Sequence, residues 1–319
     1  SIYTNLYYLS QVLIFSTYLK HDHMATAFCP AHITGFFKAE LDKEDSKQLG
    51  SLGAGFSIQK GVKTTVTIRN KTKHDISNFA IKVNGFESGD MRVSELVLSR
   101  FSTEGKFLDI THEIDVPVGY GFGCSAAVAL SLAIALNDAL ECKLSKIKVA
   151  QIAHDVEIEC KTGLGDVLAS YHGGFEIRVK PGAPGIGEVK KINSKEKLDV
   201  IIICFNPIST KKFLSERISS INGLGGKMVN RLIESNDTEE FQDMSVEFAK
   251  YVDVVTPKMD KVINLLHKNG IRCGVALFGE TIFSLVTKNE RNKVKEILKQ
   301  FNDGLVITSK IDNSGARLQ

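Results

Sequence analysis

A glycine-rich segment at 117–127, PVGYGFGCSAA, carries the residue types that most clearly predict chemistry. Its three alternating glycines permit a tight turn in which several backbone N–H groups point toward one centre. A long run of mostly apolar residues follows, so the turn would open a buried helix whose N-terminus attracts an anion. The pattern predicts a phosphate site, and the hydroxyl of Ser125 could ligate a Mg²⁺ ion that bridges nucleotide phosphates.

Other glycine-rich motifs fit this segment less well. It is not a Walker A motif, because no Gly-Lys-Ser/Thr closes it. It also departs from the dinucleotide-binding fingerprint, since Cys124 stands where that motif has glycine or alanine and Asp138 lies within the following helix. A structural alternative is that the glycines only allow close packing of a helix on a sheet.

The segment resembles the phosphate loop P-x-x-x-G-L-G-S-S-A-A of the GHMP kinases, a superfamily named for galactokinase, homoserine kinase, mevalonate kinase and phosphomevalonate kinase. In this chain a phenylalanine and a cysteine replace the leucine and the first serine of that pattern. The resemblance implies that ATP is a substrate and that Ser125 is a ligand of Mg²⁺. The implied nucleotide-binding residues are Pro117, Gly119, Gly121, Phe122, Gly123, Cys124, Ser125, Ala126 and Ala127.

An acidic segment further along is similar to the same superfamily. A helix expected over 145–160 contains Asp155 and Glu157, and a glycine-rich turn with Asp166 follows it. The resemblance implies that Glu157 is the magnesium ligand and Asp166 the catalytic acid/base, so that the metal neutralises phosphate charge while the carboxylate accepts the hydroxyl proton. Asp155 is a rival ligand. The structural alternatives are an exposed helix carboxylate for Glu157 and a turn or N-cap residue for Asp166.

Longer strings look like the archaeal pantoate kinases within this superfamily. They are PAHITGFF at 30–37, GSLGAG at 50–55, AHDVE at 153–157 and TGLGDV at 162–167, and the similarity runs from about residue 27 to residue 285. That family phosphorylates the 4-hydroxyl of pantoate in the archaeal route to coenzyme A. The alternatives are another GHMP kinase, acting on mevalonate, homoserine or a sugar, and a GHMP-fold protein that binds a ligand without catalysis.

Pantoate is a small carboxylate with two hydroxyls, so its pocket should contain a cationic group and short polar donors. Arg178, on a predicted strand, could hold the carboxylate in two parallel hydrogen bonds. His154 could instead be a buried core histidine, and Arg178 a surface residue, while His32 is expected to be structural. The substrate contacts that the resemblance implies are Ser51, His154, Arg178 and Thr210.

The elements that must position these groups follow from hydrophobic patterning. In the first half, a small-residue turn is predicted at 50–55, helices are predicted after 123 and over 145–160, and strands are predicted at 25–33 with a break at Pro30, 64–68, 79–83, 109–117 and 175–179. In the second half, strands are predicted at 200–205, 273–277, 282–286 and 304–310, and helices near 212–221, 225–235, 238–251, 256–269 and 291–300. A third family motif is reduced to GVALFGET at 274–281, which weakens any expected substrate contact there.

The predicted organisation is an N-terminal extension of unknown role, 1–23, then an ATP-binding domain, 24–194, and a C-terminal domain, 195–319. Prolines and glycines concentrated at 180–194 suggest the boundary. The GHMP resemblance implies an α+β fold whose first domain is like domain 2 of ribosomal protein S5 and whose second is ferredoxin-like. The apolar run in the extension is too short and too interrupted to span a bilayer.

Composition excludes several classes of protein. Among 319 residues, 40 are basic and 37 acidic, and the resulting charge of +3 disfavours a nucleic-acid partner. The hydrophobic content of 43% is that of an ordinary globular chain. Six scattered cysteines without a C-x-x-C pair fit free thiols in a reducing compartment, so a cytoplasmic protein is expected. No membrane partner is expected, and a homodimer is left open.

Overall fold

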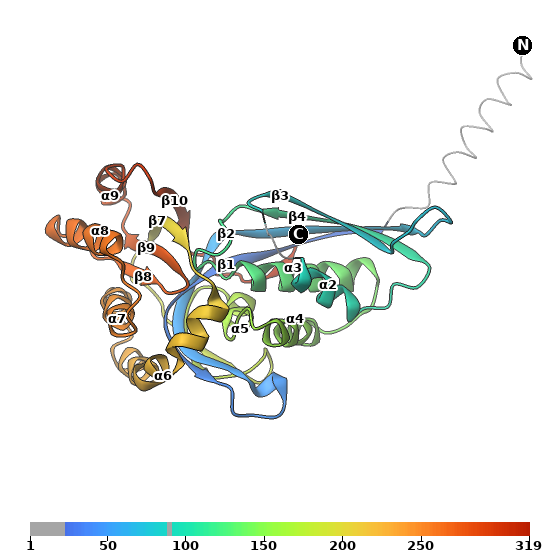
Figure 1. The fold of residues 1–319 in the computed structure, drawn as a ribbon, viewed down its shortest axis with the longest axis horizontal. Coiled ribbons are helices and arrows are strands. Elements are labelled where there is room, and N and C mark those ends of the chain that lie inside the picture. Colours follow the sequence, from blue (N-terminus) through green and yellow to red (C-terminus); the bar gives the residue numbers. More distant parts are fainter. Residues whose placement is uncertain (1–22, 88–90) are drawn as a thin grey trace, which may run out of the picture.

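The computed structural model describes residues 23–87 and 91–319, which form two packed units (Figure 1). The predicted extension, 1–23, lies outside the described residues except for His23. Within the described ranges, no helix is both long and apolar enough to cross a membrane.

The first unit is built on a seven-stranded sheet whose centre is a long hairpin of two strands, β1 and β2. The order is β11-β1-β2-β4-β3, while β5 pairs with the other end of β2 and carries β6. All neighbours are antiparallel except β3 and β4. The strands are β1 (His23–Glu40), β2 (Gly50–Asn70), β3 (Phe79–Gly85), β4 (Lys106–Ile114), β5 (Phe175–Lys180), β6 (Glu188–Lys191) and β11 (Arg317–Leu318).

The central hairpin differs from the prediction in two places. β1 does not break at Pro30, because a register shift between Pro30 and His32 absorbs the missing N–H. The expected turn at 50–55 is instead part of β2, paired with β1 and β5. Its glycines serve close packing: a Cβ at Gly53 would meet the Arg178 guanidinium, and one at Gly55 would meet the backbone of Ile33.

Helices cover one face of this sheet (Figure 1). The central one, α3, is apolar on nearly all sides and lies buried between the sheet and its neighbouring helices, as the alanine-rich run predicts. Two short helices, α2 and α5, were not anticipated by the patterning. The helices are α2 (Arg92–Ser99), α3 (Cys124–Ala139), α4 (Lys146–Cys160) and α5 (Asp166–His172).

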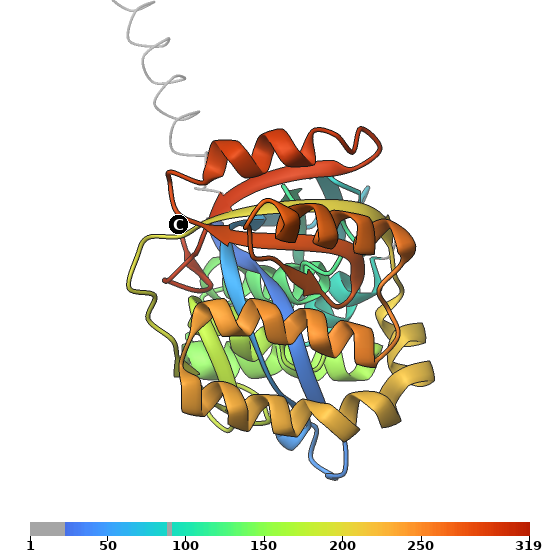
Figure 2. The same cartoon turned by 90° about the vertical axis from the view of Figure 1, so that its left-hand side faces the viewer.

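The second unit is a four-stranded antiparallel sheet of order β10-β7-β9-β8 with helices around it, of which α6 and α7 also pack against β1 of the first unit (Figure 2). Residues 200–205 of its β7 are a continuous apolar and buried run, which fits a central strand. The strands are β7 (Asp199–Pro207), β8 (Gly274–Ala276), β9 (Gly279–Val286) and β10 (Leu305–Lys310). The helices are α6 (Thr210–Ser235), α7 (Thr238–Tyr251), α8 (Pro257–Lys268) and α9 (Arg291–Leu298).

Helix α6 is continuous where the sequence predicted two helices, 212–221 and 225–235. The glycines between them are packing residues rather than a break. A Cβ at Gly225 would lie 1.9 Å from the Phe37 carbonyl oxygen, so glycine lets α6 rest directly on the backbone of β1.

The two units share one hydrophobic core. Phe56 of β2 packs edge-on against Phe283 of β9, with ring centroids 5.0 Å apart, and Phe175 of β5 contacts Phe241 of α7 at 4.7 Å. The predicted boundary at 194 falls between β6 and β7, whereas residues 311–319, assigned to the second domain, return to the first sheet through β11. This shared core therefore fixes how the two units are oriented relative to each other.

Candidate active site

The glycine-rich loop joins β4 to the N-terminus of α3. Gly119, Gly121 and Gly123 all have positive φ angles, between 59° and 89°, which explains why glycine occupies each position. Gly123 caps α3 without a side chain, so the first N–H groups of the helix stay available to an anion. These features are those of a phosphate-binding loop.

The second unit supports this loop from the other side. The hydroxyl of Thr281 donates to the Tyr120 carbonyl at 2.7 Å, and the Ile208 N–H donates to the Gly119 carbonyl at 2.9 Å. A Cβ at Gly279 would clash with the Tyr120 backbone. The reduced motif GVALFGET therefore lies against the loop, and its Phe278 reaches the pocket described below.

Ser125 and Glu157 meet at the start of α3. The Ser125 hydroxyl donates to Glu157 Oε1 at 2.9 Å, and the Thr162 hydroxyl donates to Oε2. Burial, helped by the nearby charge of Asp166, raises the pKa of Glu157 to about 7 despite the hydrogen bonds from Thr162 and Ser125. Asp155 points elsewhere: it accepts from Ser46 at 2.7 Å and pairs with Lys47 at 2.8 Å.

The hydroxyl and carboxylate oxygens of Ser125 and Glu157 are of the kind that Mg²⁺ prefers. Gly163 keeps the space beside them open, since a Cβ there would lie 2.8 Å from Glu157 Oε1 and 3.1 Å from Asp166 Oδ2. In the described part of the chain, no group of three or more His, Cys, Asp or Glu side chains could hold a metal. A cation here would complete its shell with phosphate oxygens and water, as Mg²⁺ commonly does.

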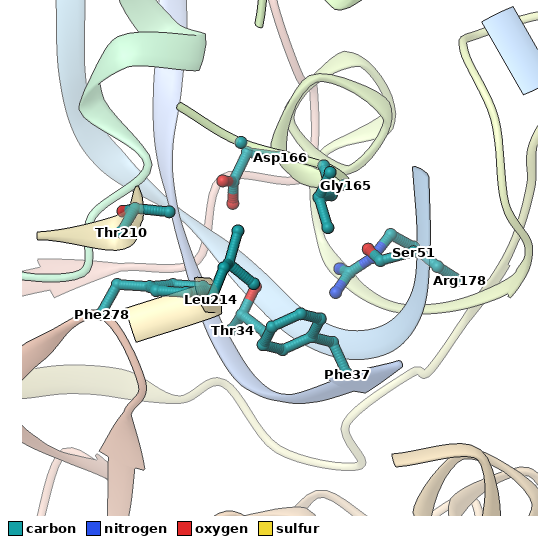
Figure 3. Close-up of a pocket in the computed structure, with 11 residues that line it drawn as sticks. Thr34, Phe37, Ser51, Gly165, Asp166, Arg178, Thr210, Leu214 and Phe278 are labelled. Carbon is teal, nitrogen blue, oxygen red and sulfur yellow. The ribbon is translucent and has the colours of Figure 1, made fainter. Parts of the chain in front are cut away.

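Asp166 begins α5 and lines a pocket beside the phosphate loop. Figure 3 shows its carboxylate and the Arg178 guanidinium pointing into this pocket from different elements. A Cβ at Gly123 would lie 3.2 Å from the Asp166 carboxyl, so loop and carboxylate are neighbours. The lining residues are Thr34, Phe37, Ser51, Gly163, Leu164, Gly165, Asp166, Arg178, Thr210, Leu214 and Phe278.

The pocket brings together Ser51, Arg178 and Thr210 of the expected substrate contacts, but not His154. His154 is buried in α4, where its Nε2 contacts the Ser46 carbonyl at 3.1 Å and burial lowers its pKa. Phe122 and Cys124 are buried in the loop, and burial raises the pKa of the Cys124 thiol to about 12.

Arg178 is not a surface residue, since only 1% of its side chain is exposed. Its guanidinium pairs with Glu176 through one terminal nitrogen, while its Nε has no hydrogen-bond partner among the described residues. Gly53 and Gly165 make room for it on two sides. A buried arginine with an unused donor at the edge of a pocket is suited to bind a carboxylate.

The sequence reasoning missed two residues of this site. His32, expected to be structural, contacts Asp166 Oδ1 through Nδ1 and Glu176 Oε1 through Nε2, both at 2.9 Å. Glu176 was not singled out. The available signal was a glutamate inside the apolar strand FEIRV, two residues before Arg178 and therefore on the same face of the strand.

Comparison with known proteins places the chain. The GHMP kinases N terminal domain model matches residues 91–174, and the GHMP kinases C terminal model matches residues 229–304. The pantoate kinase of Methanocaldococcus jannaschii is 33% identical, covering 85% of this chain and 96% of that protein. The pantoate kinase of Thermococcus kodakarensis is 30% identical, covering 86% and 92%.

Solved structures agree with this relationship. One described as a phosphotransferase related to the CoA biosynthesis pathway superimposes with a TM-score of 0.83 at 26% identity, covering 93% of this chain and 98% of the other. Homoserine kinase from Cytophaga hutchinsonii shares the fold, with a TM-score of 0.63 at 18% identity and coverage of 95% and 99%. This chain belongs to the pantoate kinase family of the GHMP kinases.

Proposed function

We propose that the protein transfers the γ-phosphoryl group of ATP to the 4-hydroxyl of pantoate, giving 4-phosphopantoate and ADP. One observation carries this proposal: Asp166 and Arg178 enter the same pocket, and the Asp166 end of that pocket touches the phosphate loop at Gly123. A hydroxy acid bound by its carboxylate at Arg178 would present its far hydroxyl to Asp166 beside the nucleotide phosphates.

The chemistry follows from this arrangement. The 4-oxygen forms a bond to the γ-phosphorus while the bond from that phosphorus to the β–γ bridging oxygen breaks, and the hydroxyl proton passes to Asp166 Oδ2. The loop N–H groups and the N-terminus of α3 stabilise the charge on the phosphates. A Mg²⁺ ion held by Ser125 and Glu157 would neutralise part of that charge.

The remaining walls of the pocket suit pantoate. Phe37, Leu214 and Phe278 form an apolar side that could contact the two methyl groups between its hydroxyls. The rings of Phe278 and Phe37 pack against each other with their centroids 5.4 Å apart, and this contact stabilises the apolar side of the pocket. The hydroxyls of Ser51 and Thr210 supply short polar groups on the other sides. His154 would need a rearrangement of the 46–48 turn to contact substrate.

The test is product analysis with purified protein and Mg-ATP. Pantoate should give 4-phosphopantoate and an equal amount of ADP, and Asp166→Asn should lower kcat by about 1,000-fold. Mevalonate, homoserine and sugars serve as alternative acceptors. Turnover of one of these without pantoate would overturn the substrate assignment, and full activity of the Asp166→Asn variant would overturn the role of the base.

Other features of the proposal rest on composition. A cytoplasmic protein without nucleic-acid or membrane partners is supported by the charge of +3 and by the free cysteines among the described residues. The phosphate site also explains why an enzyme of two anionic substrates needs no basic excess. In the proposed site, the negative charge of the two substrates is neutralised by backbone N–H groups, a helix N-terminus, a metal and one arginine.

A further inference from the structure

Four charged or ionisable side chains form a buried chain beneath the pocket. Asp166 Oδ1 contacts His32 Nδ1 at 2.9 Å, and His32 Nε2 contacts Glu176 Oε1 at 2.9 Å. The same Glu176 oxygen accepts from the Arg178 guanidinium. The side chains of His32 and Glu176 are fully buried, so no solvent competes for these contacts. The chain joins β1 to α5 and β5, which lie 134 residues or more further along the sequence.

Counting hydrogens defines the state of His32. Each of its two ring nitrogens faces a carboxylate oxygen, and an ionised carboxylate can only accept. When both carboxylates are ionised, both contacts need a ring proton, which makes the ring an imidazolium. Burial lowers the pKa of His32, but the charges and hydrogen bonds of Glu176 and Asp166 outweigh it, so the pKa is raised overall. Two cations and two carboxylates then balance within the chain.

In this geometry the two oxygens of the Asp166 carboxylate have different environments. His32 holds Oδ1, and in the described part of the chain it is the hydrogen-bond partner of this carboxylate. Oδ2 stays free toward the pocket, where Gly163 leaves room for it. An anchored oxygen on one side fixes the direction in which the other accepts a proton.

We propose that His32 is a positioning residue for Asp166, and that Glu176 ties His32 and Arg178 into one network that sets the distance between the base and the carboxylate-binding arginine. Two glycines of β2 leave space for the side chains of this network. A Cβ at Gly55 would lie 2.7 Å from His32 Nε2, and one at Gly53 would meet the guanidinium. The proposal rests on the proposed function, because it assigns the network to a hydroxy acid held at both ends.

Two substitutions of His32 separate its two contacts. In His32→Asn the amide nitrogen takes the place of Nδ1 and keeps the bond to Asp166, whereas in His32→Gln the amide reaches only Glu176. We expect His32→Gln to lower kcat about 100-fold and His32→Asn less than about tenfold, with KM for ATP unchanged. Equal losses in the two variants, or the reverse order, would overturn the proposal.

A double substitution tests whether His32 acts through Asp166. Once Asp166→Asn has removed the base, adding His32→Gln should change the residual kcat less than twofold. If His32→Gln still lowers it about 100-fold, the histidine acts elsewhere and the proposal fails. His112→Asn is the matched control, since His112 is also a buried histidine of this sheet, bonded to Thr64 and Ser94 away from the pocket. It should leave kcat unchanged.

Glu176→Gln tests the shared network. The glutamine keeps an acceptor but removes the charge that balances both cations. We expect kcat to fall and KM for pantoate to rise, each about tenfold. A change in only one of these constants would show that the base and the arginine are held independently.

A measurement without substrate separates this inference from the proposed function. In ¹⁵N-labelled wild-type protein at pH 7.5, His32 should show two ring N–H protons, and these signals should be absent from His32→Asn. A neutral His32 ring would overturn the network even if pantoate is phosphorylated. A doubly protonated ring in a protein that rejects pantoate would instead refute the substrate assignment alone.

Discussion

Replacing Gly165 by alanine isolates the packing around the arginine that we assign to substrate binding. Gly165 caps α5 with φ −118° and ψ −4°, angles that alanine adopts without strain. Its new Cβ would lie 2.3 Å from Ser51 Oγ and 2.6 Å from Arg178 Nε, whereas ordinary contact begins at 3.4 Å. One or both groups must therefore move by about 1 Å. A displacement of that size at a positioning group can cost about 100-fold in rate.

The expected result is a fall of about 100-fold in kcat/KM for pantoate, equivalent to about 2.7 kcal/mol of transition-state stabilisation. KM for ATP should stay within about twofold, because the nearest groups to the new Cβ belong to Ser51 and Arg178 rather than to the phosphate loop. Steady-state assays that vary each substrate at saturating amounts of the other measure both constants. Thermal unfolding establishes that the variant is folded.

The result that would refute this reasoning is a folded Gly165→Ala protein with kcat/KM for pantoate within twofold of wild type. Ser51 and Arg178 would then tolerate displacement, and the close packing would have no role in binding. Gly223→Ala is the control, because Gly223 is an exposed residue of α6 whose Cβ would meet only the Tyr251 hydroxyl, at 3.4 Å.

Three further predictions concern stability and metal use. Gly225→Ala should destabilise the fold by about 2 kcal/mol, because its Cβ would press on the Phe37 carbonyl. Gly223→Ala should instead stabilise the fold by up to about 1 kcal/mol. Chemical denaturation compares the two variants, and similar unfolding midpoints would contradict the packing argument. Burial lowers the pKa of His112 to about 4, so the unfolded state binds more protons between pH 6.5 and 4 and stability should fall by about 3 kcal/mol across that window as pH drops. His112→Asn should remove this part of the slope, and an unchanged slope would show that His112 is not its source. Glu157→Gln should raise the Mg²⁺ concentration for half-maximal turnover by about tenfold or more, and an unchanged titration would exclude Glu157 as a ligand.

The local chemistry of the site could be predicted from short stretches of sequence. The phosphate loop, the buried helix α3 after it and the strand that contains Arg178 depend on backbone preferences and side-chain alternation within about ten residues. Glu157 and Asp166 are indicated by the resemblance of their contiguous motifs to those of the GHMP kinases. These positions agree with the described structure, although their metal and catalytic roles remain predictions.

Pairings between distant segments could not be predicted in this way. His32 and Glu176 are 144 residues apart, and their contact depends on the register of β5 beside β2 and of β2 beside β1. The glycines at 50–55 are compatible with a turn or with a closely packed strand. Only the neighbouring strands and side chains in the folded structure show that they belong to a strand. A one-residue change of register would turn these side chains to the opposite face.

The individual groups that can bind phosphate, hold a metal and accept a proton are therefore encoded in local motifs, because backbone conformation and residue chemistry act over short distances. Which of those groups meet in one pocket is a property of the packed core. That core places Ser51, Asp166, Arg178 and Thr210 together, leaves His154 and Asp155 elsewhere, and puts His32 behind Asp166. The physical reason is that burial and strand register fix distances that no single segment contains.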